Sequence, residues 1–154
     1  MKRLLLALLM ILVMATSSWA VGTASVTNVE KVKVLNEQSR VVLTITWVDD
    51  NAGTTLAINS ATYGITGWYL YSVETNPSNV TAPTDNYDIT LVDADGVDLA
   101  GGTLMNRDTA TTELVNVGTS SIGFPVIRGT FTFTLSGNAV VGGTGTCTLV
   151  FLAN

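Results

Sequence analysis

The stretch YDITLVDADGVDLAGG, residues 87–102, is where the side chains of this sequence could do chemistry, since it holds four aspartates and three glycines. Asp93, Asp95 and Asp98 surround a glycine, and carboxylate oxygens on a tight turn are ligands that calcium prefers. The spacing departs from an EF-hand loop, because a loop begun at Asp93 has Leu104 where the bidentate glutamate should stand. The three aspartates are therefore a calcium candidate with an incomplete pattern.

A β-hairpin with an acidic turn explains the same residues. One strand would end at Val92-Asp93, and the next would begin at Val97. Asp95-Gly96 between them is favoured in tight turns, because both residue types tolerate a positive φ. We expect these carboxylates to bend the backbone, with weak cation binding as the alternative.

No pattern for catalysis is found elsewhere. Histidine is absent from the sequence, which excludes a Ser-His or Cys-His nucleophile and a zinc site with histidine ligands. Ser120 lies in GTSSIG, which lacks the spacing of a nucleophile elbow. The glycine-rich segment 142–145 precedes a predicted strand and not the helix N-terminus that binds phosphate. A pair of carboxylates is still possible, but an acidic domain supplies such pairs by chance. We predict a protein that is not an enzyme and has no cofactor, apart from possible calcium.

Alternation of apolar and polar residues predicts the elements that would position these side chains. In RVVLTITWV, Val41, Leu43, Ile45 and Trp47 share one face, and RGTFTFTLSG shows the same period of two. Turn residues such as Asn, Gly and Pro separate these runs. We predict eight or nine strands, at 24–34, 39–48, 54–59, 65–75, 86–93, 97–100, 112–117, 126–135 and 144–153.

Short antiparallel strands at this spacing predict an all-β fold. We expect one antiparallel β-sandwich, jelly-roll or immunoglobulin-like, over residues 21–154, with a small barrel as the alternative. The stretch GWYLYSV has aromatic residues on both faces, which indicates a central strand or a subunit interface. The loops 77–86 and 93–98 would form the site if the domain binds a glycan or a cation.

The first 20 residues have the layout of a signal peptide. Lys2 and Arg3 precede an apolar run over 4–15, and Ser18 and Ala20 suit a cleavage site after Ala20. The apolar run is shorter than the roughly 20 residues that a membrane span needs. We therefore expect export to the periplasm, the extracellular space or the cell surface, with no membrane contact after cleavage.

The net charge limits the kinds of partner that the domain could bind, and the cysteine content bears on its reactivity. Without the signal peptide the chain has five basic and twelve acidic residues, a net charge of −7. Such a domain is unsuited to nucleic acid, which is bound through cationic side chains. The single cysteine, Cys147, lies in a predicted strand, so we expect a buried and unreactive thiol.

Three strings within residues 67–137 carry a resemblance to a known group. These are TAPTDNYDITL at 81–91, DGVD at 95–98 and NRDTA at 106–110, with a looser likeness at GTFTF, 129–133. The segment resembles small β-rich proteins encoded among the virion genes of tailed bacteriophages. The resemblance implies a structural capsid or tail accessory subunit and supplies no catalytic residues. The signal peptide departs from that pattern, because virion proteins are normally assembled in the cytoplasm.

These observations predict a non-enzymatic structural subunit that self-associates or decorates an extracellular or virion assembly. Its partners would be copies of itself or a larger protein assembly, bound through sheet faces and strand edges. The alternative is a secreted binding module for a glycan or a cation such as calcium.

Overall fold

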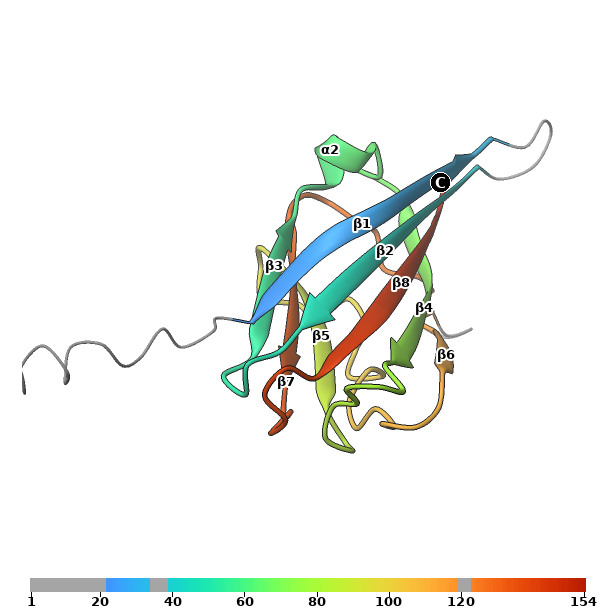
Figure 1. The fold of residues 1–154 in the computed structure, drawn as a ribbon. Coiled ribbons are helices and arrows are strands. Elements are labelled where there is room, and N and C mark those ends of the chain that lie inside the picture. Colours follow the sequence, from blue (N-terminus) through green and yellow to red (C-terminus); the bar gives the residue numbers. More distant parts are fainter. Residues whose placement is uncertain (1–21, 34–38, 119–122) are drawn as a thin grey trace, which may run out of the picture.

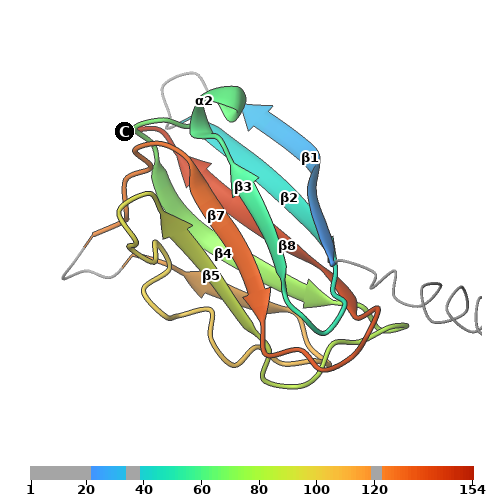
Figure 2. The same cartoon turned by 90° about the vertical axis from the view of Figure 1, so that its left-hand side faces the viewer.

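The computed structural model describes residues 22–33, 39–118 and 123–154 as a sandwich of two antiparallel sheets. The predicted signal peptide and Ser120 lie outside these residues. Figure 1 shows the larger sheet in front and the smaller one behind it, and Figure 2 shows the two layers from the side. The predicted all-β sandwich is confirmed, and the sheets do not close into a barrel.

The larger sheet has the order β1-β2-β8-β4-β6 and the smaller sheet the order β3-β7-β5. The strands of the larger sheet are β1 (Thr23–Val32), β2 (Arg40–Val48), β8 (Thr144–Leu152), β4 (Tyr69–Pro77) and β6 (Glu113–Asn116). Those of the smaller sheet are β3 (Thr54–Ile58), β7 (Phe131–Ser136) and β5 (Asp88–Asp93). A single helical turn, α2 (Ser60–Tyr63), follows β3.

The chain changes sheet at every connection after β2, which is the wrapping of a jelly roll. A complete jelly roll has eight strands. If β2 is its first strand here, the strand that should follow β5 is missing, and β1 is an additional strand at the edge of the larger sheet. The predicted strand at 97–100 falls in that place and is wrong. Residues 94–104 form successive turns, and a single bridge joins Val92 to Asp98.

The core lies between the sheets and follows the predicted alternation. On β2 the side chains of Val41, Leu43, Ile45 and Trp47 are buried, and β7 and β8 bury every second residue in the same way. Phe131 of one sheet meets a phenylalanine of the other, Phe151, with ring centroids 6.3 Å apart. Buried aromatic side chains of this size dominate the energetics of such a core.

Two other predicted strands begin later than expected. The strand predicted from residue 65 begins at Tyr69, because Gly64 and Gly67 both have positive φ and hold the chain in turns after α2. The strand predicted from residue 126 begins at Phe131, after a segment that bonds to β4 through a bridge between Tyr69 and Val126.

The two ends of the sandwich differ. We call one the loop end; it holds the connections 49–53, 78–87 and 137–143. We call the other the hairpin end; it holds α2, Trp68 and the ends of β1 and β2 at Val32 and Arg40 (Figure 1). Among the described residues, no helix is long and apolar enough to cross a membrane.

Candidate functional site

The carboxylate of Asp93 caps the acidic turn. Its Oδ1 accepts the backbone N–H of Asp95 at 3.0 Å and that of Val97 at 2.9 Å. The backbone closes the same turn, since the N–H of Gly96 donates to the carbonyl of Asp93 and Gly96 has a φ of 81°. This geometry supports a turn in which the side chain replaces missing backbone partners.

Asp98 organises the segment that follows. Its Oδ1 accepts the N–H groups of Leu91 and Ala100, both at 3.1 Å, and its Oδ2 accepts that of Gly102 at 2.8 Å. Both oxygens of this carboxylate are therefore engaged by backbone donors. Such bonds hold residues 98–102 against β5 in place of a paired strand.

Asp95, the third calcium candidate, is exposed at the tip of the turn. Nowhere in the described residues do three or more aspartate, glutamate or cysteine side chains gather as a metal site would require. Calcium binding by Asp93, Asp95 and Asp98 therefore remains a prediction, and hydrogen bonds to the backbone account for two of the three carboxylates as acceptors within turns.

The loops 77–86 and 93–98 do not form one site. They lie at opposite ends of β5, whose six residues span about 20 Å at the rise of a strand. The first loop belongs to the loop end, where an open depression of about 440 Å³ is lined by residues of β2, β4 and β8. Its polar lining includes Thr46, Asn76, Asn79 and Thr146.

A buried polar network joins the loops at the loop end, and the sequence reasoning missed it. Asp49 Oδ2 accepts the Nδ2–H of Asn138 at 2.8 Å, and Asp49 Oδ1 accepts the hydroxyl of Thr54 at 3.1 Å. Asn138 Oδ1 also accepts the N–H of Thr84 at 2.7 Å. Asp49 and Asn138 are both buried. Each stands in a turn sequence, WVDDN and SGN, so only their burial distinguishes them from ordinary turn residues.

An ion pair fixes the segment that leads into β6. Arg107 Nη1 lies 3.5 Å from Glu113 Oε2, and the Arg107 side chain is only 12% exposed. The same glutamate oxygen accepts the N–H of Asp108 at 2.9 Å. The N–H groups of Ala110 and Thr111 donate to Asp108, and they hold the pKa of its carboxyl below the ordinary value. These contacts make the segment a structural turn.

The buried titratable groups of the core are shielded and not poised for reaction. Burial raises the pKa of Cys147 to about 12, so its thiol stays protonated at neutral pH. Burial likewise raises the pKa of Tyr87 to about 12, an effect that the nearby Thr75 hydroxyl partly offsets. The Tyr87 hydroxyl, the Thr75 hydroxyl and the Trp47 N–H are buried without a partner in hydrogen-bond geometry among the described residues.

An apolar patch lies at the edge of the larger sheet. Tyr71 of β4 and Phe124 pack with ring centroids 5.1 Å apart, and each is 37% exposed. Gly118 leaves room for the Phe124 ring, because a Cβ at residue 118 would stand 2.0 Å from it. Leu114 of the edge strand β6 is 66% exposed. We call Tyr71, Leu114 and Phe124 the edge patch.

The stretch GWYLYSV was predicted to be a central strand or a subunit interface, and the structure shows the central strand. β4 is a central strand, paired with β8 on one side and β6 on the other. Leu70 and Val73 face the core, and Tyr71 faces outward. Of the aromatic residues in this stretch, Tyr71 contributes to the edge patch.

Comparison of the sequence with models of known protein families gives no match, and comparison with curated proteins gives none at a significant level.

Proposed function

We propose that the protein is a non-enzymatic structural subunit that self-associates or decorates a larger extracellular or virion assembly. The observation that supports this best is the edge patch, which leaves two aromatic rings and a leucine partly uncovered at one strand edge. Side chains of this kind are enriched in the buried centre of protein interfaces.

The position of the patch favours contact between β-rich partners. Strand β6 pairs with β4 on one side only, so alternate N–H and C=O groups along its other side face away from the sheet. An open edge of this kind can pair with a strand of another copy. Leu114 would then be buried as the new strand is added.

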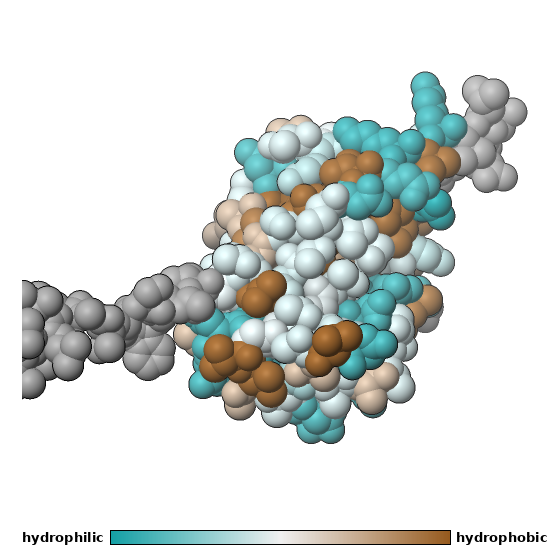
Figure 3. All heavy atoms as spheres, in the orientation of Figure 1, coloured by the Kyte–Doolittle hydropathy of each residue, from teal (hydrophilic) through white to brown (hydrophobic). Residues whose placement is uncertain are grey.

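The faces of the sandwich suit a subunit in a larger assembly. Figure 3 shows much of the outer face of the larger sheet as neither strongly polar nor strongly apolar, with apolar areas toward both the hairpin end and the loop end. Threonines dominate the outward positions, as at Thr44, Thr46, Thr146 and Thr148. The resemblance of residues 67–137 to phage virion proteins supports a structural subunit, and the expected export supports a role outside the cytoplasm.

Replacement of Leu114 by lysine tests the proposal. A charge on an edge strand opposes strand addition, so we expect the Leu114→Lys protein to associate at least tenfold more weakly than the wild type. Light scattering over a range of protein concentrations measures this. Val97→Lys is the matched control, because Val97 is a valine that is 56% exposed on the acidic turn, away from β6. Equal association of the two variants and the wild type would exclude the edge patch as the interface.

A glycan-binding module is the second candidate function. The depression beside Thr46, Asn76 and Thr146 supports it, because hydroxyl and amide groups there could hydrogen-bond sugar hydroxyls. Binding of soluble oligosaccharides, measured by calorimetry on wild-type and Asn76→Ala protein, would detect such a site. Binding that Asn76→Ala weakens supports this candidate, and no binding in the millimolar range counts against it.

A further inference from the structure

Most of the cationic residues that the structure describes are gathered at the hairpin end. Lys31, Lys33, Arg40 and Trp68 line a groove of about 230 Å³. The Lys31 Nζ lies beside Gly64, 3.6 Å from where a Cβ would stand. Trp68 is half-buried and packs against the core from this groove. An aromatic side chain among three cations is a surface suited to an acidic partner with some apolar character.

Two further facts define the charge of this end. Arg128 is exposed and follows Ile127, whose N–H donates to the carbonyl of Trp68 at 2.8 Å, so it belongs to the same end. Glu30 is the carboxylate that pairs with a cation of the groove, since its Oε1 lies 3.7 Å from Arg40 Nη2. Four of the five cations among the described residues therefore lie at the hairpin end, and three of them line the groove. The acidic turn after β5 lies at the same end but at the other edge of the smaller sheet from α2.

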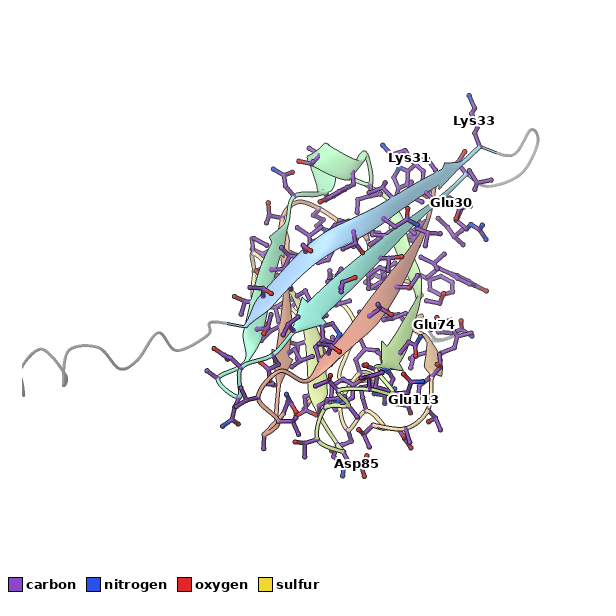
Figure 4. The ribbon with its side chains drawn as sticks, viewed as in Figure 1. Glu30, Lys31, Lys33, Glu74, Asp85 and Glu113 are labelled. Carbon is purple, nitrogen blue, oxygen red and sulfur yellow. The ribbon has the colours of Figure 1, made fainter. Side chains whose placement is uncertain are left out.

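The loop end has the opposite character. Its carboxylates include Asp50, Asp85, Asp88 and Glu113, and the only cation there among the described residues is Arg107, which is paired with Glu113. Figure 4 shows Lys31 and Lys33 at one end of the molecule and Asp85 at the other.

The loop end also exposes apolar side chains. Val80 is 88% exposed and Val141 is 68% exposed, and Val48 and Val140 are each more than a third exposed. Acidic side chains and valines thus stand together on these loops, as cations and a tryptophan stand together in the groove.

We propose that the loop end of one copy docks on the groove of Lys31, Lys33, Arg40 and Trp68 of a second copy. The argument is the complementarity of the groove and the loop end in charge and in apolar surface. The two contact surfaces are different, so the contact is head-to-tail and adds copies in a row unless a ring closes. This inference rests on the proposed self-association and names a second interface for it, distinct from the edge patch.

Charge reversal at each end provides the test. The head variant is Lys31→Glu/Lys33→Glu, and the tail variant is Asp50→Lys/Asp85→Lys. Each variant then has two ends of like charge, so we expect each alone to associate at least tenfold more weakly than the wild type in light scattering. An equimolar mixture pairs the reversed head with the reversed tail, and we expect it to regain association. Rescue in the mixture also shows that both variants are folded.

The outcomes separate the two proposals. If the wild-type protein associates and both variants associate equally well, the head-to-tail contact is overturned, but self-association is not. Variants that lose association without rescue in the mixture would also overturn it. A wild-type protein that stays a single copy at every concentration would overturn both proposals. Asp95→Lys, a reversal on the turn after β5 at the other edge of the smaller sheet from α2, lies outside both contact surfaces and should leave association unchanged.

Discussion

Asp49 and Asn138 are 89 residues apart in the chain and are joined by a buried hydrogen bond of 2.8 Å at the loop end. The bond connects the loop after β2 to the loop after β7, and Thr84 attaches the loop after β4 to the same asparagine. Loops that carry their own buried hydrogen bonds are held in one shape. A fixed shape is what a surface needs if it is to dock on a partner without ordering at each contact.

Asn138→Ala should lower the free energy of unfolding by about 2–4 kcal/mol. The substitution removes the partner of the buried Asp49 Oδ2 and of the Thr84 N–H, and polar groups without partners are costly in the interior. Urea denaturation measures the change. Asn79→Ala is the control, because Asn79 is exposed on a neighbouring loop, and its change should stay within about 0.5 kcal/mol. A loss below about 1 kcal/mol for Asn138→Ala would contradict the role of the network.

Asp98→Ala and Asp93→Ala should each destabilise the protein by about 1–2 kcal/mol, because each removes an acceptor of two or more backbone N–H groups. Asp95→Ala should change stability by less than about 0.5 kcal/mol. The melting temperature of the wild type in calcium and in a chelator separates this account from a metal site. A strong rise in calcium that all three substitutions abolish would favour the metal.

The Cys147 thiol should react with a disulfide reagent only when the protein unfolds. It is fully buried on β8, and burial raises its pKa to about 12, so the thiolate is scarce at pH 8. The rate of labelling in native buffer should match the rate of unfolding measured in parallel. Labelling within the mixing time, without denaturant, would show that the strand is accessible.

The stability of the protein should fall as the pH rises above about 10, and Tyr87 contributes to the fall. The folded protein keeps the Tyr87 proton up to about pH 12, whereas the unfolded chain loses it near pH 10. The unfolded state therefore binds fewer protons between these values, and the free energy of unfolding decreases.

Tyr87→Phe should remove that contribution, about 1–2 kcal/mol by pH 12 after allowance for partial screening. At pH 7 the same substitution should cost little, since the hydroxyl is buried outside hydrogen-bond geometry. Urea denaturation of both proteins at pH 7 and pH 11 provides the comparison. A larger loss for Tyr87→Phe at pH 7 than about 2 kcal/mol would reveal a partner for the hydroxyl.

The fold was readable from the sequence wherever one strand face is buried. The alternation in β2, β7 and β8 is strict, so their buried residues were predicted. The ranges of β2 and β8 were predicted almost to the residue, whereas the start of β7 was predicted five residues too early. Residues 97–100 misled the prediction, because Val97 and Leu99 alternate like a strand while the carboxylate of Asp98 takes up the N–H groups that pairing would need. The order of strands depends on long-range pairing, which alternation does not encode.

The functional surfaces were less readable. The turn after Asp93 followed from local chemistry and was predicted, whereas Asp98 was expected within the strand at 97–100. The network around Asp49 and the groove beside Trp68 arise where segments far apart in the chain meet. Lys31 and Trp68, for example, line one groove together with Gly64, although they are far apart in the chain. A single sequence does not show which distant segments lie side by side in the fold.

The mass of the protein without residues 1–20, measured by light scattering from micromolar to near-millimolar concentration, tests the central claim most directly. We expect a mass that rises above that of one copy as the protein concentration increases. The mass should fall again when salt is raised to 0.5 M, because the distance over which charges attract each other, about 10 Å at 0.1 M salt, becomes shorter. A mass equal to one copy across the whole range, at low and high salt, would contradict the account.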